Sequence, residues 1–431
     1  MRADARGSRR VQTLMLSLVS IIAALVMVVL VIIVVAVVGW VILAAADALP
    51  IPDRRWPRLS AWAIVLIPAV ALLLAFFISR RAEGRTFYAQ QSANRWVSAL
   101  LLVVIIGLLV ALGEAIAATF TFDAYGALAG AGLASIAGLG AAGYAHFRGP
   151  GAVLGSARAR LITTTSEPSG GAASAVEQRL LDVVAELSIA ANMPPPAVFV
   201  VDDPSPNAMA VGTNSRNAAI AVTIGMLGSF DREQLQGVVA HELGHIRNLD
   251  SRYGVYVAIL VGLVALVTDG FLRIVVEAWR NGLFLRGAAV DNDKGAIAGL
   301  VLGGGAGLLL LLVAGFLRIF APLASLLVQA AVSRQREYLA DATSVELTRN
   351  PTALARALAA IRDDPRQPRT RPNRGSQHLW FSSPLRHADD TGWHLLATHP
   401  SLDGRIARIG ALFPEGGVRE ETWEPRESRP A

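Results

Sequence analysis

The feature that most constrains this chain is a series of long segments that carry no charged residue. The first, from Val11 to Ala46, contains no Asp, Glu, Lys or Arg. Five further apolar runs follow, at Leu59 to Ser79, Val97 to Phe120 (broken only by Glu114), Ala124 to Phe147, Tyr253 to Thr268 and Gly295 to Leu317. Because about 20 apolar residues in a helix cross a bilayer core, the sequence predicts about six transmembrane helices.

Composition agrees with a membrane protein and removes several other classes. Hydrophobic residues make up 53% and charged residues 17% of the 431 residues, whereas soluble domains average about 25% charged residues. The chain has no cysteine, which excludes a disulfide framework and a cysteine nucleophile. The net charge of +6 comes from arginines scattered in loops rather than from a basic stripe with aromatic residues, so we expect no nucleic-acid partner.

Arginine placement predicts the orientation in the membrane. Four arginines precede the first apolar run, and the loop after the second run carries Arg80, Arg81, Arg85 and Arg95. Cytoplasmic loops are enriched in basic residues, so we expect the N-terminus and the large polar segments inside the cell. The first run is far longer than the 7–15 apolar residues typical of a signal peptide, which favours a retained anchor.

The chain therefore divides into membrane and polar parts. We expect an N-terminal two-span extension (1–82), a hairpin of spans 3 and 4 (83–148), a first polar segment (149–252), a hairpin of spans 5 and 6 (253–333), and a second polar segment with the C-terminal tail (334–431). The polar parts carry an amphipathic helical pattern from Val176 to Leu187 and β-rich stretches at Ala197 to Val201, Asn207 to Val211 and Ala218 to Thr223. The predicted fold class is a mostly α polytopic membrane protein with a cytoplasmic α+β domain.

A metal-binding pattern lies on the helix that Asp231 and Gln234 should open as a capping box. The residues are His241-Glu242-Leu243-Gly244-His245. Positions i and i+4 share a helix face, so the two histidines can bind one zinc ion, and Glu242 can act on the water beside it. A chance match on an amphipathic helix is the alternative.

A second acidic pair can complete this site. Glu337 and Asp341 are again four residues apart, so Glu337 can supply the third ligand while Asp341 accepts the free ring N–H of one histidine. An exposed acidic pair among arginines is the alternative. Two apolar runs separate His245 from Glu337, and an even number of crossings returns the chain to the same side. The short distances to both neighbouring runs, about 12 Å along a continuous helix from His245 to Tyr253, predict a metal site close to the membrane face.

These motifs together resemble the HtpX-type family of membrane zinc metalloproteases, relatives of the CAAX prenyl proteases. The matching residues include Phe87-Tyr88, Asn94-Arg95, Asp202 to Ala208, Ala219 to Thr223, Val239 to Ile246, Ser333 to Asp341, Thr398-His399-Pro400 and Arg405-Ile406. The first 80 residues have no counterpart in this pattern, and Ser401 stands where the family often has a second proline.

The resemblance implies one zinc ion per chain and a zincin-like domain with an edge-exposed sheet. It implies that Asn207 and Ala208 lie on an edge strand that pairs with an extended substrate, with an ordinary edge strand as the alternative. It places His399 and Arg405 near the active site as substrate-binding residues, with a structural Thr-His-Pro turn as the alternative for His399. It further implies quality control of unfolded or damaged membrane proteins by a multi-pass plasma-membrane enzyme whose site faces the cytoplasm.

Two other functions stay open from the sequence. One is a site-specific processing protease of the CAAX or signalling-peptide type, and the other is a non-catalytic membrane scaffold with a structural metal. Glu114 is an acid inside an apolar run and is a functional candidate on that ground, but a role in helix packing or at the end of the span is the favoured interpretation. The oligomeric state is not predicted.

Overall fold

A computed structural model describes residues 124–163, 174–281, 336–369, 376–382 and 400–412, together with scattered helical positions between residues 70 and 117. The spans expected at Val11 to Ala46 and Gly295 to Leu317 lie outside the described residues, and the second expected span is described only at isolated positions. The chain divides into two compact units. Ala99–Leu139 and Leu266–Ala321 belong to the first, while Gly140–Ala265 and Pro322–Ala431 belong to the second.

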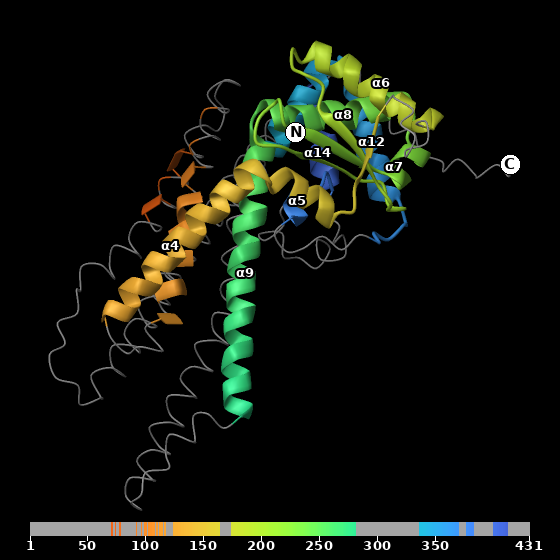
Figure 1. The fold of residues 1–431 in the computed structure, drawn as a ribbon. Coiled ribbons are helices and arrows are strands. Elements are labelled where there is room, and N and C mark those ends of the chain that lie inside the picture. The colour runs from red at the N-terminus through yellow and green to blue at the C-terminus, as the bar shows by residue number, and fades with distance from the viewer. Residues whose placement is uncertain are drawn as a thin grey trace, which may run out of the picture. The chain divides into compact units, whose positions relative to one another are not determined.

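The second unit is built on a four-stranded mixed sheet (Figure 1). Its strands are β1 (Arg160–Ile162), β2 (Ala197–Val201), β3 (Ala208–Val211) and β4 (Ala219–Thr223), in the order β1-β2-β4-β3. β2 and β4 are parallel, whereas β1 and β3 pair antiparallel with their neighbours. The three β-rich stretches found in the sequence are confirmed as strands. β1, which has three residues, was not predicted.

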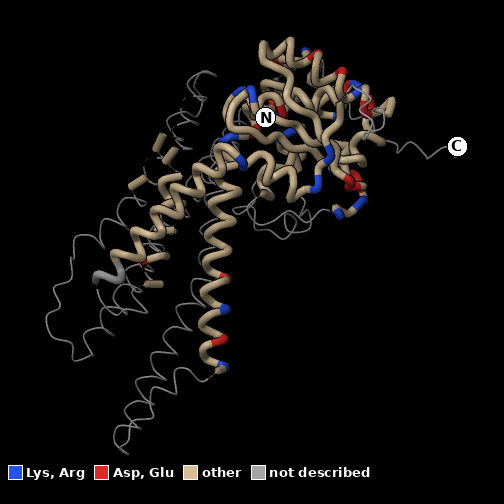
Figure 2. Tube along the Cα trace, in the orientation of Figure 1, with Lys and Arg blue, Asp and Glu red and all other residues tan. Residues whose placement is uncertain are grey.

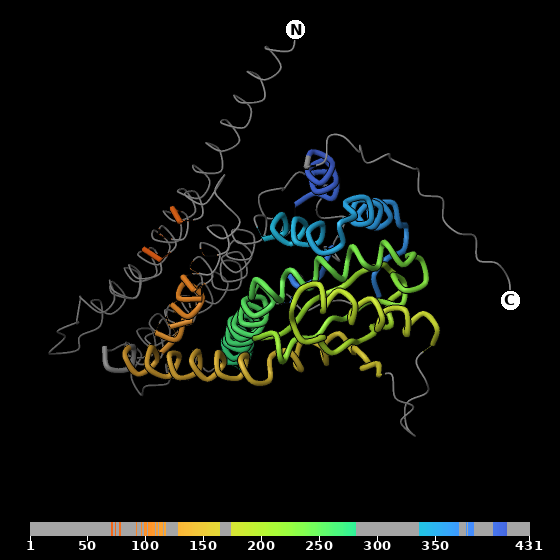
Figure 3. Tube along the Cα trace, turned by 90° about the horizontal axis from the view of Figure 1, so that it is seen from above, coloured from red at the N-terminus to blue at the C-terminus, as the bar shows by residue number. Residues whose placement is uncertain are grey.

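One face of the sheet packs against helices α6 (Ala175–Ala190) and α8 (Arg232–Arg247). Figure 3 shows α6, α8, α12 (Pro351–Asp363) and α14 (Leu402–Leu412) following one another across this layer. Fully buried side chains such as Leu180, Leu235 and Leu354 join them into one core, and each stabilises the fold by about 1.5–3 kcal/mol relative to an exposed position. The predicted capping box is confirmed, because Asp231 and Gln234 bond reciprocally to each other's backbone N–H groups.

The other face is also covered, which explains why every residue of β3 and β4 is buried. It packs against α5 (Gly149–Ser156), the end of α4 (Ala124–Phe147) and the start of α9 (Asp250–Arg280). A sheet covered on both faces carries continuous rather than alternating apolar residues, as the sequence of β4, AIAVT, does.

Two described helices are long and apolar enough to cross a membrane, α4 over Leu128–Phe147 and α9 over its 31 residues. α4 has the bounds expected for the fourth span. α9 continues past Asp269 to Arg280, so the fifth apolar run is only part of a longer helix. Its charged residues beyond the first turn all lie between Asp269 and Arg280, as the coloured far end of this helix in Figure 2 shows.

Small residues in the first unit allow two helices to approach each other closely at Gly113 and Gly130. A Cβ atom at Gly113 would lie 2.8 Å from the carbonyl oxygen of Gly130, so the two backbones touch and only glycine fits. Glu114 also belongs to this unit, whereas His241, His245 and Glu337 belong to the second.

Candidate active site

The site is built on α8, the helix beneath the sheet. Glu242 and Leu243 are buried and His241 is fully buried, because this face of the helix packs below β3 and β4. The other ligand-bearing element is a helix over residues 336–348. Its Ser344 donates to the carbonyl oxygen of Gly237 at 2.7 Å, which fixes it against α8.

Gly244, between the two histidines, lets these helices approach each other. A Cβ atom there would lie 3.1 Å from Cβ of Thr343 and 3.3 Å from Cα of Ala340. Any larger residue at this position would push the 336–348 helix outward. The glycine therefore sets the distance between the histidines and Glu337.

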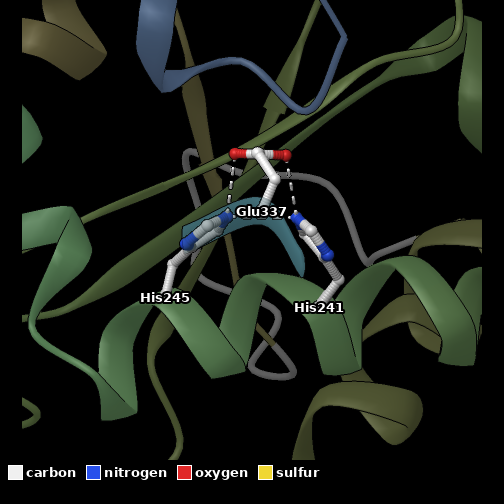
Figure 4. Close-up of side chains that lie close together, drawn as sticks. All are labelled: His241, His245 and Glu337. Atoms are coloured by element: carbon white, nitrogen blue, oxygen red, sulfur yellow. Dashed lines mark hydrogen bonds and ion pairs between the residues drawn. The ribbon is translucent and has the colours of Figure 1, made fainter. Parts of the chain in front are cut away.

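His241, His245 and Glu337 converge on one point (Figure 4). Their nearest ligand atoms all lie within 4.8 Å of one another, and no other group in the described parts of the chain meets this condition. The two Nε2 atoms are 3.0 Å apart. The carboxylate oxygens of Glu337 lie 3.7 Å from Nε2 of His241 and 3.5 Å from Nε2 of His245.

These separations fit a tetrahedral metal ion. Zinc bonds of about 2.0–2.1 Å place tetrahedral ligand atoms about 3.3–3.4 Å apart, close to the three distances found here. Two imidazoles and one carboxylate are also the donor set of many catalytic zinc sites, where the fourth position is left open. His241, His245 and Glu337 therefore fit a single metal ion. The structure brings together the three residues that the sequence predicted as ligands.

The His241 half of the site is a buried ionic network. The ring donates from Nδ1 to Oδ1 of Asp341 at 2.9 Å, in the role expected for Asp341. Arg405 donates twice to the same carboxylate, at 3.0 and 2.6 Å, and its Nη1 lies 3.2 Å from Oε2 of Glu337. The guanidinium also stacks on the ring of Phe381, 4.7 Å from the ring centroid. Asp341 and Arg405 thus fix the positions of His241 and Glu337 relative to each other.

Arg405 was expected to bind substrate, but the structure places it inside the protein. It has no exposed surface, and its guanidinium is occupied by Asp341, Glu337 and the carbonyl oxygen of Phe381. This geometry suits a residue that positions the ligands. His399, expected beside it, lies outside the described residues.

The His245 half depends on Asp250, a residue that the sequence did not single out. Oδ2 of Asp250 lies 3.3 Å from Nδ1 of His245, and Oδ1 lies 3.4 Å from Nε of Arg336. On a continuous helix residue 250 would lie about 140° around from residue 245. The helix is not continuous, because Leu249 adopts a left-handed φ of 61° between α8 and α9. This break returns Asp250 to the site and also ends the continuous helix assumed between His245 and Tyr253.

The two histidines have opposite pKa shifts. Burial, together with the nearby Arg405 cation, lowers the pKa of His241 to about 4. Burial also acts to lower the pKa of His245, but the hydrogen bond to Asp250 and the charge of Glu337 outweigh it and raise this pKa to about 9. In the metal-free protein one proton therefore resides on His245, and its Nε2–H points at the neutral His241.

Glu242 is placed for proton transfer. Both oxygens of its carboxylate are buried, and neither has a well-formed hydrogen bond to a described residue. Burial raises its pKa to about 7, with a further contribution from the negative charge of Glu337. A carboxylate with a pKa near neutrality suits a general base that must also give the proton back.

The edge of β3 is already paired. The backbone N–H of Phe381 donates to the carbonyl oxygen of Ala208 at 2.7 Å, and Trp380 pairs antiparallel with Met209. The side chain of Asn207 forms two hydrogen bonds with the backbone of Ser382. It donates to the carbonyl oxygen at 2.9 Å and accepts from the N–H at 3.1 Å. Asn207 and Ala208, the residues expected to hold a substrate backbone, thus hold a segment of the same chain.

Comparison with known proteins agrees with the resemblance seen in the sequence. Residues 174–412 match peptidase family M48. The chain is 40% identical over 233 residues to a "Protease HtpX homolog" of Caldanaerobacter subterraneus subsp. tengcongensis, a match that covers 54% of this chain and 71% of that protein. A homolog of the same name from Tropheryma whipplei is 38% identical over 273 residues, or 62% of this chain and 82% of the relative. No solved structure matches the chain.

The family match covers more than half of the chain and contains every residue of the metal site. The two relatives are 40% and 38% identical to this chain, and the His-His-Glu cluster could hold a metal ion. This chain therefore belongs to peptidase family M48 and is a metalloprotease.

Proposed function

We propose that this protein is a membrane-embedded zinc endopeptidase that hydrolyses peptide bonds of unfolded or damaged membrane proteins at the cytoplasmic face of the plasma membrane. One observation carries this proposal. The metal-binding cluster lies at the start of α9, since Asp250 in the first turn of that helix contacts His245. A helix of this length and apolarity can cross a bilayer, which supports a site that acts near the membrane surface.

The proposed arrangement places spans at the N-terminal extension (1–82) and in the hairpins 83–148 and 253–333, with protease segments 149–252 and 334–431 on one side. The joining of residues on both sides of the second hairpin into one compact unit supports it. The excess of arginine at the N-terminus supports a cytoplasmic site.

A zinc ion held by His241, His245 and Glu337 would polarise the scissile carbonyl and lower the pKa of its water to about 7. Glu242 then takes a proton from the attacking water and delivers it to the leaving amine. Asp341 and Asp250 hold the two rings with Nε2 facing inward. Arg405 balances the negative charge of Glu337 and Asp341. The proposed mechanism passes through no covalent acyl-enzyme.

Broad rather than site-specific cleavage is favoured by how the edge of β3 binds a chain. We call this edge, where residues 380–382 pair with Asn207 to Met209, the substrate groove. The hydrogen bonds that Asn207 and Ala208 make to the segment all involve its backbone atoms. Backbone contacts recognise an extended conformation and little of the sequence. Such a groove suits unfolded substrates better than a single processing site.

Replacement of Glu242 by glutamine tests the catalytic part of the proposal. The amide keeps the shape of the side chain but cannot accept the proton, so the variant should bind zinc as the parent does and lose hydrolysis by at least about 10²-fold. Zinc content and cleavage of a fluorogenic peptide, with and without chelator, are the measurements. Full activity in the variant removes Glu242 from this role.

The substrate part needs a second experiment. Purified enzyme in liposomes should cleave an unfolded membrane protein at several positions. Cleavage of unfolded casein alone, with no membrane substrate cut, contradicts the proposed substrate class. One dominant cleavage site would instead support a processing enzyme.

A further inference from the structure

The segment that pairs with β3 occupies the place where a substrate backbone is expected. Three hydrogen bonds join Asn207 and Ala208 to Phe381 and Ser382, and all of them involve backbone atoms of the segment. The pairing is antiparallel. An extended peptide of almost any sequence could offer the same N–H and carbonyl groups.

The segment also reaches the catalytic centre. The ring of Phe381 lies 4.8 Å from the ring of His241, measured between centroids, and its carbonyl oxygen accepts a hydrogen bond from Arg405. Trp380 and Phe381 line the same small cavity as Glu242, His245 and Glu337. The segment is therefore in the groove beside the metal ligands and not at a remote part of the sheet edge.

We propose that residues Leu379 to Ser382 are an internal occupant of the substrate groove, so that the protease rests in a self-blocked state until a substrate strand displaces them. This inference rests on the proposed function, because it assigns a regulation to the same site. The segment differs from a permanent fifth strand of the sheet in one respect, because catalysis requires its pairing with β3 to open.

Competition with a tethered segment sets a threshold for substrates. A segment on the same chain has an effective concentration on the order of millimolar, far above that of a dilute peptide. A substrate gains no advantage from its backbone, because it forms the same hydrogen bonds that the segment gives up. It must instead match the burial of Trp380 and Phe381, which are 4% and 2% exposed.

The substrate class follows from this requirement. Peptides with two adjacent large apolar residues should displace the segment most readily, since they can refill both apolar positions. Such stretches are abundant in membrane proteins and are accessible as extended chain only when the protein is unfolded. Folded proteins and polar peptides would leave the groove blocked.

A reversible lock tests the inference. Met209 and Trp380 are direct antiparallel partners. The hydrogen bond from the N–H of Phe381 to the carbonyl oxygen of Ala208 joins residues that flank this pair. Met209 and Trp380 are therefore a non-hydrogen-bonded pair, with Cα atoms about 4.5 Å apart. That spacing lies within the range of disulfides. The chain has no cysteine of its own, so the double variant Met209→Cys/Trp380→Cys in the full-length protein offers one possible disulfide.

The oxidised double variant should cleave a fluorogenic peptide at least about tenfold more slowly than the same protein treated with a phosphine reductant, with equal zinc content in both states. A matched pair at the opposite edge of the sheet, Leu161→Cys/Phe199→Cys, should show no such dependence. Equal activity in the locked and reduced states overturns the self-blocking. If the parent protein and both reduced variants all contain zinc and none cleaves peptide, the proposed protease function fails, and this inference fails with it.

A loosening variant gives the opposite effect. Trp380→Ala weakens the docked segment, so KM should fall about fivefold while kcat stays unchanged. Phe230→Ala removes a buried aromatic of similar exposure, 3% against 4%, away from the groove, and should leave KM as it is. A zinc-loaded Trp380→Ala protein with lower kcat/KM than the parent would show that the segment is a permanent part of the site, which contradicts the self-blocking.

Discussion

The two halves of the metal centre differ although their histidines are one helical turn apart. The His241 half is closed, with Asp341 and the buried Arg405 around a ring that has no exposed surface. The His245 half is more open, with 15% of the side chain exposed, and relies on Asp250 from the start of α9. Burial, together with the Arg405 cation, lowers the pKa of His241, whereas the hydrogen bond to Asp250 and the charge of Glu337 outweigh burial and raise the pKa of His245.

The difference assigns separate tasks to the two rings. His241 is neutral near pH 7 and ready to bind a cation. His245 carries the proton that a metal ion must replace. The first half provides a rigid ligand, and the second makes metal binding sensitive to pH and to the position of α9.

Loss of Glu337 should have the largest effect, since this carboxylate faces both halves. Glu337→Ala removes a ligand, so metal affinity should fall by more than the roughly 10–100-fold caused by loss of an outer hydrogen-bond partner, and peptide cleavage should disappear. Metal content after dialysis is the measurement. Glu346→Ala, an exposed position on the same helix, is the control. Unchanged occupancy in the Glu337 variant would contradict the ligand set.

Substitution of the two outer carboxylates compares the halves directly. Asp341→Asn leaves Arg405 buried with Glu337 as its remaining anionic partner, so the guanidinium competes with the metal for that carboxylate. We expect metal affinity to fall roughly 10–100-fold. Asp250→Asn keeps an acceptor for His245 and should cost only a few-fold. Competition with a chelator of known affinity measures both, and a larger loss at Asp250 would reverse the assignment of the rigid half.

The raised pKa of His245 predicts the pH dependence of metal binding. Its proton is bound below about pH 9 and must leave when the metal binds. Affinity should therefore rise by about tenfold per pH unit between pH 7 and 9 and level off above that range. Calorimetry in buffers of different ionisation enthalpy should detect close to one released proton at pH 7.5, and fewer in Asp250→Asn. No release in the parent would place the proton elsewhere.

The smallest effect is expected at Gly244, where the two ligand-bearing helices meet. In Gly244→Ala the new Cβ lies against Thr343 and Ala340, and the 336–348 helix must shift by a few tenths of an ångström. We expect a few-fold loss of metal affinity with little change in the pKa of either histidine. Gly228→Ala, where a Cβ would meet nothing within 4 Å, is the control. Equal behaviour of the two variants would mean that helix spacing does not limit the site.

Much of this site could be predicted because helical geometry is local. The spacing of His241 and His245, the acidic pair Glu337 and Asp341, and the capping box at Asp231 each depend on residues within one or two turns. The strands β2, β3 and β4 were predicted from apolar runs. β1 was missed because three residues carry too little pattern, and Asp250 was missed because a helix break at Leu249 changes its direction.

The burial of Arg405 and the pairing of Asn207 with Ser382 could not be predicted in the same way. Each joins residues far apart in the sequence: 64 positions separate Arg405 from Asp341, and 175 separate Asn207 from Ser382. Nothing within a few residues of either partner indicates the contact. The resemblance indicated that these positions matter but not which groups they touch.

By itself the sequence indicated the chemistry of this protein: apolar runs long enough to cross a membrane, and a pair of histidines with acids at helical spacing that can bind a metal. The tertiary structure decided what surrounds that chemistry. Helix periodicity is set by neighbouring residues, so it can be read along the chain. The charge state of each histidine and the occupant of the β3 edge depend on side chains brought together only when distant segments pack.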